Sequence, residues 1–92
     1  MKITGVDKVE DCFDGTSAVR YSFDQAWNEE SILSLKCVGK LDYFPDFPRP
    51  FFRVIEPRGM QLKGIAGEDN CLAIFPKEGR EAIKREFEER FS

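Results

Sequence analysis

The densest group of residues able to do chemistry is a set of carboxylates that precedes Gly15. Its members are Asp7, Glu10, Asp11 and Asp14. Carboxylate oxygens suit hard cations such as calcium, and two carboxyl groups can act as a general acid and base. The spacing does not match an EF-hand loop, which also ends in a Glu that is missing here. We therefore expect a solvated hairpin edge, where charge discourages edge-to-edge aggregation.

Nucleophilic and metal chemistry lack their usual residues, because the chain contains no histidine. Serine and cysteine nucleophiles that depend on an imidazole base are thereby excluded. Cys12, Cys37 and Cys71 are widely spaced, whereas structural zinc sites usually take thiolates in close pairs. We expect Cys37 and Cys71, which stand in apolar alternation, to be small core residues. The sequence predicts no catalytic residue, metal or cofactor, and these observations favour a protein that is not an enzyme.

The segment 43–58 has the most informative pattern, because aromatic residues alternate there with prolines and arginines. Prolines stiffen a loop and reduce the entropy lost on binding, and aromatic and arginine side chains are enriched among residues that dominate binding energy. The candidate partner-binding residues are Tyr43, Phe44, Phe47, Arg49, Phe51, Arg53 and Arg58. In the competing interpretation several of these rings fold into the core. The small size of the chain favours that interpretation.

Turn signals and alternating residues predict the elements that hold these side chains. Asp14-Gly15 predicts a type I′ hairpin turn, because both residues tolerate positive φ, between strands over 6–13 and 17–23. Alternation over 33–37 predicts a third strand, which extends towards residue 43. Residues 24–31 are interpreted as a loop or one short helical turn, with a capping box at 22–25. Further strands are predicted over 51–56, 60–65 and 71–75.

The C-terminal region predicts a helix over 77–91, with Pro76 at its first position. Ile83, Phe87 and Phe91 recur every four residues and form one narrow apolar stripe. An isolated helix of this length is marginal in water, so the stripe must dock on the strands.

Strands joined by close turns and followed by a helix define the α+β class. We expect residues 1–92 to form a single small domain, a mostly antiparallel sheet or small barrel of about five to six strands with one C-terminal helix packed on it. The closed version would resemble a pleckstrin-homology-type domain in element order. The chain shows no signal-peptide pattern and no apolar run of membrane-spanning length, so we expect a cytoplasmic protein without membrane contact.

Three functions remain open. The first is a non-catalytic binding or accessory domain that contacts another protein, or a second copy of itself, through the candidate residues. The second is single-stranded nucleic-acid binding through aromatic and basic residues of 36–63, the less favoured one because the net charge is −3. Residues 36–66 are nevertheless the one net-basic third of the chain. The third is a small-ligand or enzymatic domain that uses carboxylates and Arg.

Overall fold

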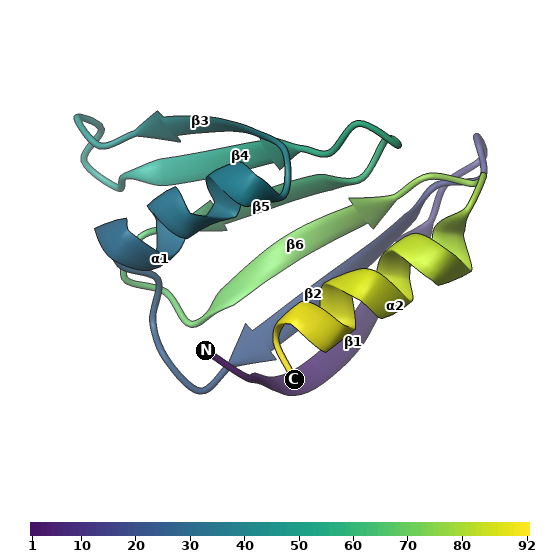
Figure 1. Ribbon diagram of the computed structural model, residues 1–92, viewed down its shortest axis with the longest axis horizontal. Helices are drawn as coiled ribbons and strands as arrows, with labels where there is room; N and C mark the ends of the chain where they lie inside the picture. Colours follow the sequence, from purple (N-terminus) through teal and green to yellow (C-terminus); the bar gives the residue numbers. More distant parts are fainter.

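The computed structural model describes all 92 residues as one six-stranded antiparallel sheet with helices on one side (Figure 1). The elements in chain order are β1 (Ile3–Asp11), β2 (Ser17–Phe23), α1 (Glu29–Leu33), the 3-10 helix η1 (Ser34–Cys37), β3 (Lys40–Phe44), β4 (Phe51–Ile55), β5 (Gln61–Ile65), β6 (Asn70–Phe75) and α2 (Arg80–Arg90). The strand order is β1-β2-β6-β5-β4-β3, and the edge strands β1 and β3 do not pair with each other. The predicted α+β class is confirmed, and the sheet is open rather than a closed barrel.

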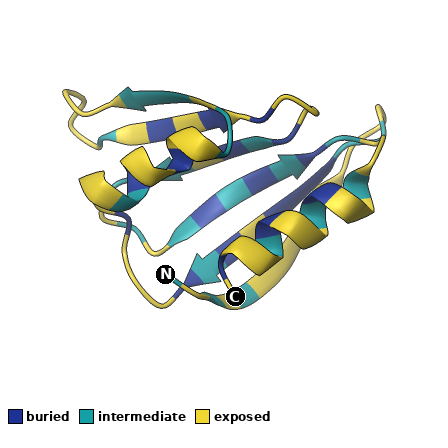
Figure 2. Ribbon diagram, viewed as in Figure 1, coloured by how far each residue is buried: buried dark blue, intermediate teal, exposed yellow.

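Both helices lie on the same face of the sheet, α2 over the half that contains β1 and β2 and α1 towards the half that contains β4 and β5 (Figure 1). Buried residues alternate with intermediate ones along β6 and with exposed ones along β4 (Figure 2). One face is therefore the core and the other faces solvent. The ends of the chain meet, because the amide of Ile3 donates to the carbonyl of Phe91 at 2.9 Å. Neither helix has the length and apolar character needed to cross a membrane.

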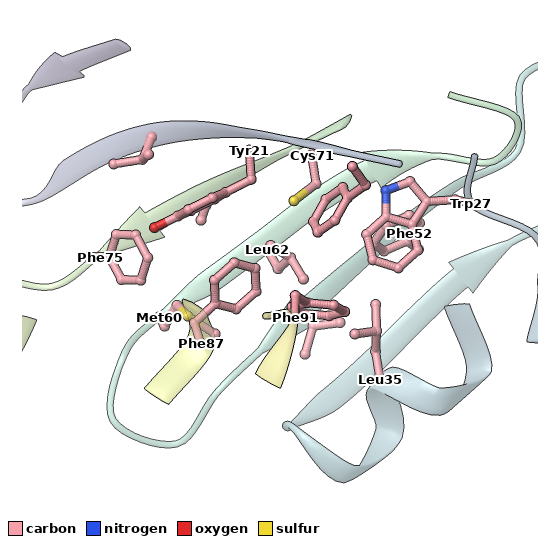
Figure 3. Packing of buried hydrophobic residues seen from close by; sticks show 14 of the residues in the cluster. Tyr21, Trp27, Leu35, Phe52, Met60, Leu62, Cys71, Phe75, Phe87 and Phe91 are labelled. Carbon is pink, nitrogen blue, oxygen red and sulfur yellow. The ribbon is translucent and has the colours of Figure 1, made fainter. Parts of the chain in front are cut away.

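The core lies between the sheet and the helices and contains many aromatic rings (Figure 3). The predicted stripe docks as expected, because Ile83, Phe87 and Phe91 are all buried. The Phe87 ring lies 4.9 Å from that of Tyr21, and the Phe91 ring lies 5.3 Å from that of Phe23. Full burial of one such side chain stabilises a fold by about 1.5–3 kcal/mol.

Gly64 allows the core to close against β5. A Cβ atom at this position would lie 2.5 Å from Cζ of Phe52, a ring that is fully buried. The Phe52 ring therefore packs directly on the backbone of β5. This close approach explains a glycine in a strand interior, where it otherwise weakens a sheet.

The hairpin between β1 and β2 differs from the predicted type I′ turn. Only Gly15 has a positive φ, and its amide donates to the carbonyl of Cys12. The amide of Cys12 in turn donates to the carbonyl of Thr16. This is a longer loop in which one glycine takes the left-handed position. The Asp14 carboxylate accepts hydrogen bonds from the amide and hydroxyl of Thr16, so it closes the loop.

The strand predicted over 33–37 is wrong. This segment is the end of α1 followed by η1. The buried residues of the two helices are Ile32 and Leu35, which are three apart as in a helix. The capping box uses Asn28 and Ser31 rather than residues 22–25. Cys37 is exposed, contrary to the expectation of a core residue, whereas Cys71 is buried as expected.

The C-terminal helix begins later than predicted, at Arg80 rather than residue 77. Its N-cap is Gly79, whose φ of 72° lies in the left-handed region. This turn interrupts the helix-forming residues that follow Pro76. Ile83, the first residue of the stripe, still lies within the helix.

Candidate functional site

The uncovered face of the sheet carries one continuous line of side chains across all six strands. Cross-strand pairing sets this central row in the order Asp7, Arg20, Leu72, Lys63, Arg53 and Asp42. Its middle positions therefore hold three cations and one leucine, with a carboxylate at each edge strand. The helices lie on the opposite face (Figure 1), so this row is open to solvent.

Two cations of the central row are direct neighbours. Arg53 on β4 pairs with Lys63 on β5, and side chains at such positions have Cβ atoms about 4.5–5.5 Å apart. Arg53 donates to the Asp42 carboxylate at 3.0 Å, whereas Lys63 takes part in no ion pair. Like charges directly opposite each other destabilise a sheet. The middle of the uncovered face thus holds an uncompensated positive charge.

Three phenylalanines form an exposed aromatic cluster at one end of this face. Phe44 ends β3, Phe51 begins β4, and Phe47 lies in the loop between them. Ring centroids are 4.6 Å apart for Phe44 and Phe51, and 5.3 Å apart for Phe47 and Phe51. Phe47 is 51% exposed, and the other two rings are more than one-third exposed. Contiguous exposed apolar surface of this kind marks binding sites in soluble proteins.

The loop that carries Phe47 is fastened to the sheet at its C-terminal end, next to β4. The amide of Ala66 donates to the carbonyl of Pro50 at 2.8 Å, which fastens the loop to the end of β5. The guanidinium of Arg49 pairs with the carboxylate of Glu68 in the turn between β5 and β6. Because Pro lacks an amide hydrogen and has a fixed φ, the prolines of this loop further restrict it. These contacts restrain the loop that carries the Phe47 ring of the aromatic cluster.

A hollow of about 370 Å³ lies beside the aromatic cluster on the uncovered face. Its cationic lining comes from Arg20, Arg53 and Lys63, and its apolar lining includes Leu72 and Phe51. We call this region the cationic hollow. The guanidinium of Arg20 donates to the amide oxygen of Asn70 at 2.9 Å, which orients it without cancelling its charge.

The structure brings together most but not all of the candidate residues from the sequence. Phe44, Phe47 and Phe51 form the aromatic cluster, Arg53 lines the cationic hollow, and Arg49 fastens the adjacent loop. Two candidates lie elsewhere. Tyr43 is half-buried and packs against the core on the helix side. Arg58 lies in the turn between β4 and β5, beside α2.

Arg58 belongs to a second concave region, a cleft of about 620 Å³ lined by α2, the end of η1 and the turn between β4 and β5. It pairs with Glu56 at 3.1 Å and with Glu86 of α2 at 2.5 Å. The hydrogen bond to Glu86 and then that to Glu56 raise the pKa of the Arg58 guanidinium. These contacts satisfy the buried Glu56 carboxylate and connect the β4–β5 turn to α2. We therefore interpret Arg58 as a structural residue.

Cys37 also lines this cleft. Its sulfur accepts a hydrogen bond from the Arg90 guanidinium at 3.2 Å. Cys71 lies in the core, where burial raises the pKa of its thiol to about 12. Because the thiolate is the nucleophilic form, we expect Cys71 to be unreactive in the folded protein.

Two of the acidic residues before Gly15, Asp11 and Asp14, make local contacts of the β1–β2 hairpin. The Asp11 carboxylate pairs with Lys8 and accepts a hydrogen bond from the hydroxyl of Ser17. Both contacts, led by that with Lys8, lower the pKa of the Asp11 carboxyl. Hydrogen bonds from Thr16 lower the pKa of Asp14 in the same way. These carboxylates lie on or next to the edge strand β1, as the sequence predicted.

Sequence reasoning missed Arg20 and Leu72 as site residues. The alternation of β2 places Arg20 on the other face of the strand from the buried Val19 and Tyr21. The exposure of Arg20 could therefore be predicted. Its position next to Leu72 and near Lys63 depends on β6 lying between β2 and β5. No local sequence pattern encodes that strand order.

No protein-family model, curated protein or solved structure matches this chain.

Proposed function

We propose that this domain is a non-catalytic binding module, and that its uncovered sheet face binds a segment of a partner protein. The observation that carries the proposal is the exposed aromatic cluster of Phe44, Phe47 and Phe51 beside the cationic hollow. Rigid aromatic anchors next to arginines dominate the energy of protein interfaces. The proposal places the domain in the cytosol, the compartment that keeps exposed thiols such as those of Cys12 and Cys37 reduced.

Charge complementarity determines the chemistry of the partner segment. The exposed cations Arg20, Arg53 and Lys63 lie next to the aromatic cluster, so the favoured occupant carries acidic side chains together with aromatic or aliphatic ones. Complementary charge accelerates the encounter and fixes register, and burial of the apolar side chains supplies affinity.

Single-stranded nucleic acid fits this face less well. Bases stack on aromatic rings whose faces are free, whereas the Phe44 and Phe51 rings stack on each other with an interplanar angle of 26°. The net charge of −3 also opposes a polyanion. A second copy of the chain would bring a like central row of cations to the interface, which makes it a poorer occupant than an acidic segment.

The test is selection of a random peptide library on the immobilised domain, followed by fluorescence polarisation with the enriched peptides. Phe47→Ser removes one ring of the cluster. Phe13→Ser is the matched control, because Phe13 is also exposed but lies in the β1–β2 turn, at the opposite end of the sheet (Figure 1). We expect peptides rich in acidic and apolar residues that bind the control normally and bind Phe47→Ser at least about tenfold more weakly.

Four results would contradict the proposal. One is the absence of any enriched sequence, and another is enriched peptides that bind Phe47→Ser as tightly as the control. The third is an oligothymidylate that displaces the peptides with an affinity that falls steeply with salt, which would assign the face to nucleic acid. A concentration-dependent dimer in sedimentation velocity that is lost in Phe47→Ser would instead make the occupant a second copy.

A further inference from the structure

We propose that the cationic hollow is an anion-binding subsite that receives one Asp or Glu carboxylate of the partner segment. The inference rests on the proposed function, since it assigns a chemical role to one part of the same face. The two proposals have different requirements. The aromatic cluster alone could bind an apolar segment of any charge, whereas the subsite requires a carboxylate.

Arg53 and Lys63 are two like charges in electrostatic conflict. These residues are direct cross-strand partners, and Asp42 offsets the charge of Arg53 alone. Local conflicts that do not help folding are typical of functional positions. An anion placed between the two cations would relieve the conflict. The free protein lacks such a group, because Lys63 has no carboxylate partner.

The shape and polarity of the hollow favour the binding of an anion. Leu72 separates Lys63 from Arg20 along the central row, so an apolar surface lies between the cations. Apolar surroundings reduce the screening of charges by water, which strengthens an ion pair formed there. A carboxylate on a short side chain could contact the cations while the neighbouring residue of its segment packs on Phe51.

A carboxylate in the lining of the hollow limits the charge of the anion that fits there. The lining of the hollow also includes Glu68, which is paired with Arg49. This carboxylate would repel a second negative charge on the ligand, and the net charge of the protein is already −3. The site therefore suits the single charge of a carboxylate better than the double charge of a phosphate group.

The test uses 3-phenylpropionate, a small molecule that joins a carboxylate to an aromatic ring, and its neutral amide, 3-phenylpropionamide. Each is titrated into the ¹⁵N-labelled domain, and the amide signals of Gly64 and Leu72 are followed by NMR. We expect saturable shifts with the carboxylate and binding at least about tenfold weaker with the amide, as the loss of charge-assisted hydrogen bonds predicts. Inorganic phosphate should bind more weakly than the carboxylate.

The variants Lys63→Gln and Arg20→Gln should each lose most of the preference for the carboxylate over the amide. Lys40→Gln is the control, since Lys40 lies on the same face of an edge strand but pairs with Ile55. The inference is overturned if the two ligands bind equally, if neither shifts the signals, if Lys63→Gln keeps the preference, or if phosphate binds more tightly.

Failure of this inference is distinguishable from failure of the proposed function. Library peptides that depend on Phe47 but keep their affinity when each Asp and Glu is replaced by the amide residue would leave the face as a docking surface and remove the carboxylate subsite. Loss of the dependence on Phe47 would remove the docking surface itself.

Discussion

Lys63→Gln should stabilise the folded protein, although Lys63 belongs to the binding face. The substitution removes one of the two like charges paired across β4 and β5, and it breaks no ion pair. Cross-strand pairs of this kind change stability by about 0.2–1 kcal/mol. Two charges about 6 Å apart in water repel by about 0.7 kcal/mol, which falls in the same range. We expect a gain of this size in the free energy of unfolding.

The assay is thermal and urea unfolding followed by circular dichroism, at low and at high salt. A gain of about 0.2–1 kcal/mol corresponds to a rise in Tm of roughly 1–8 °C for a domain of this length. The gain should shrink at about 1 M salt, where the Debye length is about 3 Å. Lys40→Gln provides the control, because the cross-strand partner of Lys40 is Ile55, and it should change stability little.

Two results would refute this reasoning. A Lys63→Gln variant less stable than the natural chain would show that the lysine is compensated by contacts that the structure does not contain. A gain that persists unchanged at high salt would show that repulsion between charges is not its cause. Either result would remove the reason to assign Lys63 to a binding role.

The remaining predictions concern the core and the thiols. Phe91→Ala should lower the free energy of unfolding by about 3–5 kcal/mol in a urea titration, because the ring fills an aromatic core; a loss below about 1 kcal/mol would contradict its place there. Gly64→Ala should cost about 1–3 kcal/mol in the same assay, because its Cβ would overlap a buried ring, and an unchanged midpoint would contradict that packing. Iodoacetamide should label Cys12 and Cys37 but not Cys71 in the native protein, and mass spectrometry of the intact chain would reveal a third adduct if the core were open. Burial raises the pKa of Cys71 from its ordinary value of 9.0 to about 12, so above pH 9 the unfolded chain loses this proton first. Stability should then fall with a slope approaching about 1.4 kcal/mol per pH unit, and Cys71→Ala should remove that part of the slope; an identical slope in the variant would contradict the assignment.

The elements that the sequence predicted best are those with local signals. The alternation of β2 and the apolar stripe of α2 each follow from a period that neighbouring residues set, and Ile83, Phe87 and Phe91 are buried as that period requires. The segment 33–37 misled the prediction because Leu33, Leu35 and Cys37 alternate by chance. Ile32 and Leu35 are the residues that pack, and their spacing of three is a helical period.

The candidate site was partly predictable for the same reason. Aromatic and proline residues next to one another in the chain drew attention to Phe44, Phe47 and Phe51, and these rings meet in the structure. Arg20 and Lys63 flank Leu72 in one row only because β6 lies between β2 and β5. That order results from long-range packing.

An NMR map of the ¹⁵N-labelled domain with a library-selected peptide bound would locate the binding face directly. We expect the largest amide shifts on the uncovered face, around Phe51, Lys63 and Leu72. We expect little change in α2 or in the cleft beside it. Shifts concentrated at Met60 and Phe87, which line that cleft, would contradict the account and place the binding site on the helix side of the sheet.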